Sequence, residues 1–356
     1  MDFTIDNEQK ALAGAVREML ARRAVTQSPN GAGPRAHDPD LWAAMAETGL
    51  LGLPFSEEAG GFGASAVEVF LASRELGRAA VQTPYADALL ATALLVAAGA
   101  EELVEAAVSG HDLLLPALAE PMRAFAPVPG GLTASVEGDT ATLDGVKGPI
   151  RFGSAAGGLI ASAASDEGTV LVLLDASTDE TEVLSCEGFR GRVLLCGSEA
   201  DEALTDALAL ASVALAGQAL GAMESAVTIT TEYLKTRRQF GVPLAAFQAL
   251  THRAADMYVS LELARSTAMY LAMSVAEGDT DPAMVSRCRV VLGRTGRHIG
   301  QEAIQLHGGI GMTAEYAVGH LTAMLTAIEH THGDSTQHLG SLAAEVAGHE
   351  SVLLLS

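Results

Sequence analysis

Residues 237–241 of the chain read RRQFG, and residues 305–313 read QLHGGIGMT. The first stretch places two cations, an amide, an aromatic ring and a glycine at an expected turn between two long helices. Paired arginines can hold a phosphate through bidentate contacts, and the ring can stack on a flat ligand. The glycines of the second stretch let a backbone approach a ligand, and its amides suit an anion. Spacing alone leaves a solvated helix corner and a glycine helix cap as equally good interpretations.

Both stretches lie in a part of the chain whose apolar periodicity predicts long helices. The four predicted segments are residues 203–235, 245–277, 282–307 and 316–348. Asp281-Pro282 supplies a capping residue and a first-turn proline at the start of the third segment. Helices of this length predict an antiparallel four-helix bundle at the C-terminal end of the chain.

Between residues 113 and 202 the helical periodicity disappears, and short β-prone runs alternate with Gly, Asp and Ser. The runs are TASVEG, TATLDG, TVLVLL, TEVLSC and RVLLC. Residues 136–140, Val-Glu-Gly-Asp-Thr, predict a hairpin turn between the first two runs. This segment therefore predicts a small middle β domain.

The first part of the chain predicts a further helical domain. Asp6 and Gln9 fit a capping box, and Asp38-Pro39 repeats the signature of a helix start. A glycine-rich loop at residues 49–63 is followed by helical stretches at 66–77 and 85–108. Helices, then strands, then helices predict an α+β fold in three parts. The predicted domains are residues 1–112, 113–202 and 203–356.

The composition narrows the class of protein. The 356 residues carry 44 acidic and 21 basic side chains, a formal charge of −23. With no long Lys/Arg run, this charge argues against nucleic-acid binding. Three cysteines without CxxC spacing predict neither a disulfide scaffold nor a metal site. No signal peptide is visible, and the longest uncharged run, residues 207–223, predicts a buried helix rather than a membrane span. We therefore expect a cytoplasmic protein.

Taken together and in this order, the motifs are specific enough to indicate one protein family. RRQFG, then FQ and HRAADM at residues 247–257, then QLHGGIGMT with Glu315-Tyr316, resemble the acyl-CoA dehydrogenase family of flavoproteins. The loop GLLGLPFSEEAGGFG at residues 49–63 is similar to that family's glycine-rich loop. The order of helices and strands matches the family fold, so the resemblance covers essentially the whole chain.

The resemblance implies an FAD that lies extended across a subunit interface and an acyl-CoA substrate. It implies two groups of cofactor residues. Those contacting a flavin seated mainly in the partner subunit would be Arg237, Gln239, Phe240, Gln305, Gly308 and Gly309. Ser335 and Gln337 would contact the adenine half of the subunit's own FAD.

The same resemblance leaves the catalytic base in question. In this family a carboxylate removes the α-proton of the thioester while the β-hydrogen leaves as hydride to the flavin. The usual glutamate positions align with Gly333 and Ala211, neither of which can take a proton. Asp334 is the nearest carboxylate and the candidate base. Its alternative role is a turn or helix cap in the sequence HGDS.

The β segment also departs from the family pattern on its flavin-facing side. A TEPxAGSD-like segment of the family is reduced here to Glu120-Pro121 followed by Met-Arg-Ala-Phe at residues 122–125. The family strand K-x-W-I-[TS]-N-G reads KGPIRFG at residues 147–153, with Pro149 in place of Trp and Arg151 in place of a hydroxyl residue. The side that would face the flavin ring and the substrate has therefore lost the family's residues, whereas the interface motifs retain them.

This asymmetry suggests the subunit without catalytic Glu in a heteromeric bacterial acyl-CoA dehydrogenase, such as a heterotetramer acting on fatty-acid or steroid side chains. One alternative is a self-sufficient homo-oligomer that uses Asp334. Another is a different flavin reaction on the same fold, such as a monooxygenase using His332 or His338. The acyl group is not readable from the sequence.

Overall fold

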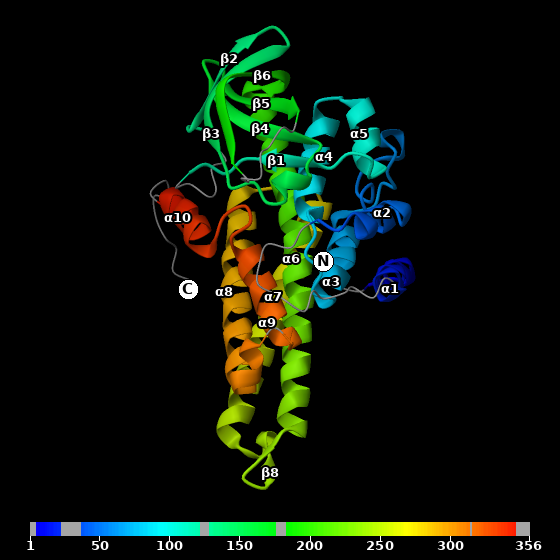
Figure 1. The fold of residues 1–356 in the computed structure, drawn as a ribbon, viewed down its shortest axis with the longest axis vertical. Coiled ribbons are helices and arrows are strands. Elements are labelled where there is room, and N and C mark those ends of the chain that lie inside the picture. The colour runs from blue at the N-terminus through cyan, green and yellow to red at the C-terminus, as the bar shows by residue number, and fades with distance from the viewer. Residues whose placement is uncertain (1–4, 23–36, 122–127, 176–182, 314, 347–356) are drawn as a thin grey trace, which may run out of the picture.

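A computed structural model describes residues 5–22, 37–121, 128–175, 183–313 and 315–346. Figure 1 shows a sheet at one end of the molecule, helices of the N-terminal part beside it, and long helices running away from it. The long helices are α6 (Gly197–Thr236), α7 (Gln248–Ala276) and α8 (Pro282–His307). The predicted α+β fold, with helical, sheet and helical parts in succession, is confirmed.

Within its described residues, the N-terminal part contains five α-helices. They are α1 (Asn7–Arg22), α2 (Pro39–Glu47), α3 (Ala66–Arg78), α4 (Tyr85–Ala97) and α5 (Glu101–Val108). The capping box is confirmed, since Gln9 N donates to Asp6 Oδ1 (2.8 Å) and Asp6 N donates to Gln9 Oε1 (3.1 Å). The single helix predicted over residues 85–108 is wrong. Two helices form there because Gly99, with φ of 65°, takes a left-handed conformation that ends the first one.

In the part of the chain that the structure describes, six strands form the middle sheet, in the order β1-β4-β2-β3-β6-β5 with an additional β4–β5 pairing. They are β1 (Leu114–Ala117), β2 (Leu132–Glu137), β3 (Thr140–Lys147), β4 (Gly158–Ser165), β5 (Gly168–Asp175) and β6 (Leu184–Cys196). The predicted hairpin is confirmed, because Glu137 pairs with Thr140 at its turn.

Two details of the strand prediction need correction. The runs TEVLSC and RVLLC predict separate strands, but from Leu184 onward both belong to one strand, β6. Residues 181–182 lie outside the described part. The prediction also misses β1 and β4. The sequences of these strands, LLPA and GLIASAAS, show no alternation of apolar and polar residues, so their period gives no signal.

The C-terminal part continues with α9 (Ala317–Glu329) and α10 (Ser335–Val346). The predicted bounds of α8 are confirmed, but the single helix predicted over residues 316–348 is wrong. His332 (φ 55°) and Gly333 (φ 98°) turn the backbone between α9 and α10. The buried Arg289 stabilises this turn, because its guanidinium donates to the carbonyls of Ile328, Thr331 and Gly333 at 2.6–3.1 Å.

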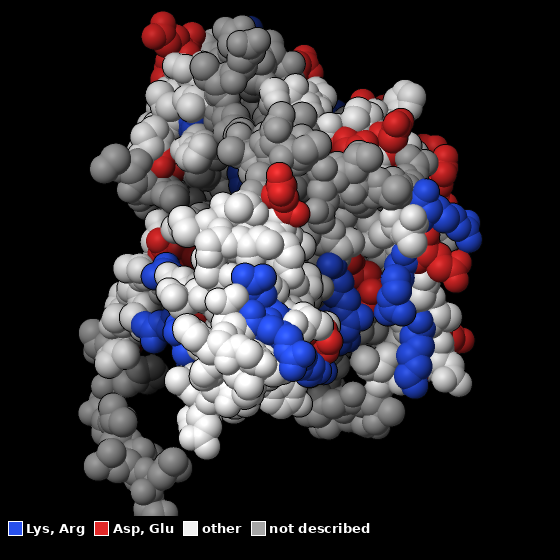
Figure 2. Space-filling view, turned by 60° about the horizontal axis from the view of Figure 1, so that its bottom comes forward, with Lys and Arg blue, Asp and Glu red and all other residues white. Residues whose placement is uncertain are grey.

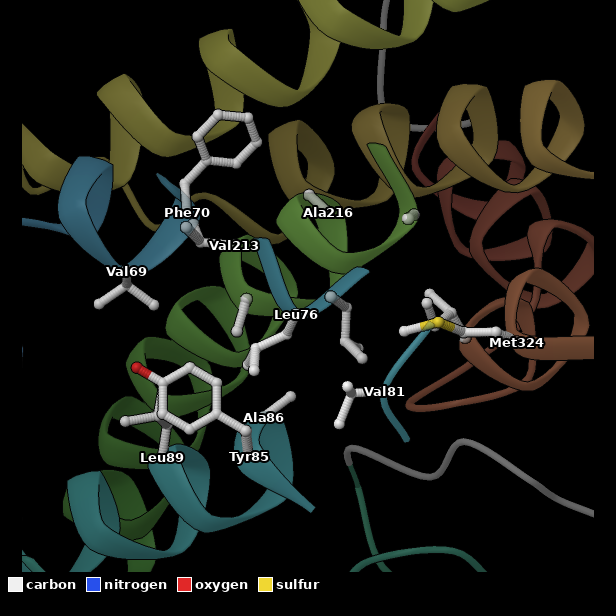
Figure 3. Close-up of a cluster of buried hydrophobic side chains, with 14 of the residues drawn as sticks. Val69, Phe70, Leu76, Val81, Tyr85, Ala86, Leu89, Val213, Ala216 and Met324 are labelled. Carbon is white, nitrogen blue, oxygen red and sulfur yellow. The ribbon is translucent and has the colours of Figure 1, made fainter. Parts of the chain in front are cut away.

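The core is centred on α6, which packs closely on α3. A Cβ at Gly217 would meet the carbonyl oxygen of Phe70, so only glycine permits this approach. Figure 3 shows the side chains buried at this contact, among them Val69 and Leu76 from α3 and Val213 from α6. The predicted buried helix at residues 207–223 is confirmed. Among the described residues, α6 is long and apolar enough to span a membrane, but 72% of its apolar window is buried inside the fold.

Candidate functional site

The RRQFG stretch forms the tip of the turn between α6 and α7. Arg237 ends α6, with its N–H bound to the Tyr233 carbonyl (2.8 Å), and the short strands β7 (Arg238–Gln239) and β8 (Val242–Pro243) fold back on each other. Phe240 has a φ of 52° and is 92% exposed. Its ring lies edge to face against that of Phe247, with ring centroids 6.2 Å apart. The tip is thus built to present its side chains outside this chain.

The QLHGGIGMT stretch lies at the end of α8. Gly308 (φ 65°) ends the helix, and a short 3₁₀ helix, η4 (Gly308–Met312), follows. Gln305, Gly308 and Gly309 are exposed, and a Cβ on either glycine would meet no atom within 4 Å. The space that the glycines leave open is therefore available to an external group. This agrees with the close backbone approach that the sequence predicts.

The tertiary structure brings the two stretches together. The ring of His307 stacks on that of Tyr233 and is tilted against that of Tyr316, with centroids 4.4 Å and 5.0 Å away. Tyr233 precedes the RRQFG tip by one helical turn, and His307 precedes the exposed glycines. The two predicted binding segments therefore form one surface, which we call the interface tip (residues 237–241 and 305–309).

A separate cavity of about 170 Å³ lies where the sequence places the flavin-ring side. We call it the ring-side cavity. Its lining residues are Asp87, Pro116, Leu118, Ala119, Pro149, Arg151, Ala327, His330, Thr331 and His332. Pro149 and Arg151, the two departures from the family strand, thus lie beside the segment that holds Gly333. The sequence analysis did not identify Asp87.

Polar side chains that line this cavity contact one another. His332 Nε2 lies 3.0 Å from Asp87 Oδ1, with both side chains about 10% exposed, and Arg151 donates to the hydroxyl of Thr331. Burial opposes ionisation of Asp87, but the contact with His332, its charge and that of Arg151 outweigh it and hold the pKa of Asp87 below its ordinary value. A lone carboxylate in the apolar run YADALLATALL is the signal that could have pointed to Asp87.

Neither usual base position offers a carboxylate. Ala211 is fully buried in α6, and Gly333 lies in the turn before α10. The candidate base Asp334 acts as the cap of α10, since its Oδ1 accepts from Gln337 N (2.8 Å) and its N–H donates to Gln337 Oε1 (3.0 Å). The structure therefore supports the capping role for Asp334, and its role as a base stays a prediction.

The residues expected at the chain's own adenine site have partners inside the fold. Ser335 is buried, and both its N–H and its hydroxyl donate to Glu329 Oε1, at 3.0 Å and 2.6 Å. Gln337 is bound to Asp334 as described above.

His338, the residue named for a monooxygenase reaction, is buried between Ser286 and the His332 carbonyl. Burial, followed by the charge of Arg289, lowers the pKa of His338 to about 4. These groups contribute to α10 and its packing.

The retained Glu-Pro segment has a structural anchor. Lys147, fully buried in β3, donates to Glu120 Oε1 (2.8 Å) and to Ser162 Oγ (3.1 Å). Although burial acts in the opposite direction, the hydrogen bonds from Lys147 and from the backbone of residues 130–131 lower the pKa of Glu120 to about 2. Residues 122–125, where the family's ring contacts would follow, lie outside the described residues.

Comparison with known proteins agrees with this architecture. Models of the acyl-CoA dehydrogenase N-terminal and C-terminal domains match residues 6–110 and 202–347. The chain belongs to the acyl-CoA dehydrogenase family of oxidoreductases. It is 26% identical to acyl-CoA dehydrogenase FadE27 of Mycobacterium tuberculosis, over 98% of this chain and 99% of the relative. It also matches the structure of a Tcur3481-Tcur3483 steroid ACAD variant, with 28% identity and a TM-score of 0.85 over 96% of this chain and 98% of the other.

Acyl-CoA dehydrogenases use FAD, and the fold is that of a glutaryl-CoA dehydrogenase from Mycobacterium smegmatis in complex with FADH2 (TM-score 0.85, 22% identity, 98% of this chain and 96% of the other). The residues of this chain fit such a cofactor unevenly. The interface tip offers exposed cations, an amide and open glycines, which suit a flavin diphosphate. The ring-side cavity does not fit a flavin ring, since its volume of about 170 Å³ lies below the roughly 300 Å³ at which small-molecule pockets begin.

Among the described residues, no group of three or more His, Cys, Asp or Glu could hold a metal.

Proposed function

We propose that this chain is the subunit without catalytic Glu in a heteromeric, FAD-dependent acyl-CoA dehydrogenase, and that it completes the FAD site of a partner subunit. The observation that carries the proposal is the contrast between its two half-sites. The interface tip projects outward, with Phe240 at 92% exposure, while the ring-side cavity is small and closed by the Asp87–His332 pair.

The predicted cofactor residues of the interface tip contribute different contacts in this proposal. Arg237 holds the diphosphate of the partner's FAD, because a guanidinium fork matches two phosphate oxygens. Phe240 packs on the adenosine side, and Gln239 and Gln305 add amide hydrogen bonds. Gly308 and Gly309 let the backbone come close to the same cofactor. When bound, FAD accepts the hydride that leaves the β-carbon of the acyl-CoA.

Three further points support the partner's role in the chemistry. The usual base positions are Gly333 and Ala211, and Asp334 is engaged as a helix cap. The carboxylate that removes the α-proton would therefore come from the partner subunit. The name of the structural relative at 28% identity, Tcur3481-Tcur3483 steroid ACAD, joins two proteins, which is the arrangement proposed here. That name also makes a steroid acyl-CoA a useful substrate to test beside straight-chain thioesters.

The decisive experiment purifies this chain alone and together with an acyl-CoA dehydrogenase chain encoded beside it. Flavin absorbance and native mass are then recorded for both preparations. We expect the chain alone to be colourless, and the mixed oligomer to be yellow and active with one FAD for each pair of unlike subunits. A yellow, active homo-oligomer of this chain would refute the proposal and favour the alternative in which Asp334 is the base.

A further inference from the structure

A groove of about 900 Å³ lies between α3, α6, α7 and α9 and shares no lining residue with the ring-side cavity or the interface tip. We call it the arginine groove. Its charged lining is Arg74 and Arg78 from α3, Arg265 from α7 and Glu224 from α6. The rest of its wall is largely apolar and includes Ala79, Ala80, Val227, Ile229, Tyr258, Leu261, Ala317 and Leu321. A cationic end beside apolar walls suits a ligand with both characters.

The three guanidinium groups converge on one carboxylate. Arg74 contacts both oxygens of Glu224, through Nε (2.9 Å) and Nη2 (2.5 Å), and Arg78 Nε and Arg265 Nη2 lie at 2.8 Å and 3.1 Å. The Glu224 side chain is only 9% exposed. Three cations against one anion leave the lining with two excess positive charges, in a chain whose formal charge is −23.

Two neighbouring carboxylates, Glu75 and Glu262, reduce this excess without cancelling it, because a fourth arginine, Arg17, shares Glu75. Glu75 binds Arg78 Nη1 at 2.8 Å but is shared with Arg17, and Glu262 lies 3.5 Å from Arg265 and is 44% exposed. Figure 2 shows that Lys and Arg side chains gather on the face seen when the lower end of the helices is turned forward, with few Asp and Glu among them. An anion that approaches this face meets a favourable field despite the overall charge.

One donor in the groove lacks an acceptor. Within the described residues, the Nε of Arg265 is buried and has no hydrogen-bond partner. A buried N–H without an acceptor is unfavourable, and an anionic ligand would remove that penalty. Guanidinium forks match carboxylate and phosphate oxygens equally well in geometry.

We propose that the arginine groove binds an amphipathic anion, a carboxylate or phosphate that carries an apolar chain. The head group contacts Arg265 and Arg74, and the chain lies along Leu261 and Leu321. The volume of about 900 Å³ falls within the roughly 300–1,000 Å³ usual for small-molecule sites. Because the groove shares no residue with the two half-sites of the FAD proposal, the two ideas stand or fall separately.

Calorimetric titration of the purified full-length chain with decanoate, decyl phosphate and decanol tests this site. We expect saturable binding of at least one of the two anions, with decanol at least about tenfold weaker, since the charged head supplies the hydrogen bonds. The preferred anion identifies the head group. Absence of anion binding, or equal affinity for decanol, would overturn the proposal.

Variants locate the binding. Arg265 is 41% exposed, so Arg265→Ala leaves the core intact, and we expect it to weaken anion binding about tenfold. Arg265→Lys keeps the charge but loses the fork, and an intermediate loss is expected. Arg22→Ala, at an exposed arginine of α1 outside the groove, is the matched control and should bind like the parent. Unchanged affinity in Arg265→Ala would place any bound anion elsewhere and refute the groove.

Discussion

The imidazole of His307 stacks on the phenol ring of Tyr233, with ring centroids 4.4 Å apart and 28° between the planes. His307 Nδ1 lies 2.7 Å from the Ala303 carbonyl, and burial lowers the pKa of the ring, which the hydrogen bond only partly offsets. Burial therefore favours the neutral form of the His307 ring in this stack. The stack joins the last turns of α6 and α8, and so fixes the two segments of the interface tip relative to each other.

Tyr233→Ala should weaken flavin retention by the mixed oligomer, although Tyr233 is not itself a proposed flavin contact. An aromatic pair contributes about 0.5–1.5 kcal/mol beyond its buried area, so we expect a loss of about two- to tenfold. Equilibrium dialysis of FAD measures it. Tyr233→Phe keeps the ring and should bind FAD like the parent. Equal retention by Tyr233→Ala would show that the stack does not position the tip.

Arg237→Ala should reduce the flavin content of the purified mixed oligomer by about tenfold or more, because a charge-assisted bidentate contact is lost. Flavin absorbance per unit of protein is the measurement. Lys235→Ala, at an exposed lysine paired with Glu232 in the last turn of α6, removes the same charge nearby and serves as the control. Unchanged flavin occupancy in Arg237→Ala would remove this residue from the cofactor site.

Asp334 gives opposite expectations for its two roles. As a helix cap, it can be replaced by Asn with little effect, whereas Asp334→Ala should destabilise the protein by about 0.5–2 kcal/mol. We expect the dehydrogenase activity of the mixed oligomer to be undiminished in Asp334→Asn. Thermal melting and a turnover assay on the same preparations separate the roles. A collapse of turnover in Asp334→Asn with unchanged stability would restore Asp334 as the base.

The buried Glu120–Lys147 pair predicts an acid-sensitive component of stability. The folded-state pKa of Glu120, about 2, lies below its ordinary value of 4.5. The ionised Glu120 therefore adds about 3 kcal/mol to the free energy of unfolding. This contribution is complete above pH 4.5 and is lost as the pH falls towards 2. Lys147→Met leaves Glu120 buried without its cation and should cost about 3–5 kcal/mol at neutral pH. Urea unfolding at several pH values measures both effects.

A double variant provides the control for this pair. Glu120→Gln with Lys147→Met removes both charges, and we expect it to be closer in stability to the parent than Lys147→Met alone. It should also lack the acid-dependent loss described above. If Lys147→Met and the double variant were equally unstable at every pH, packing of the lysine stem rather than the charge pair would hold this segment.

Much of the fold could be predicted because its signals are local. Asp281 caps α8 through hydrogen bonds to the N–H groups of Ala283 and Met284, and the predicted bounds of that helix are those observed. The split between α9 and α10 has a local signal only in part, namely the turn or cap that the sequence HGDS suggests at Asp334. The turn also depends on Arg289, which reaches from α8 to three of its carbonyls, and no local pattern encodes a contact of that range.

The candidate site, too, has features that the sequence determines and features that only the tertiary structure decides. The sequence by itself determined the family, the two segments of the interface tip and the absence of a carboxylate at positions 211 and 333, because these are properties of residue identity and order. Only the tertiary structure decided that His332 lies against Asp87, that Asp334 caps a helix, and that three arginines share Glu224. These pairs join residues on different elements or fix a local turn, and their burial and charge exist only once the helices have packed.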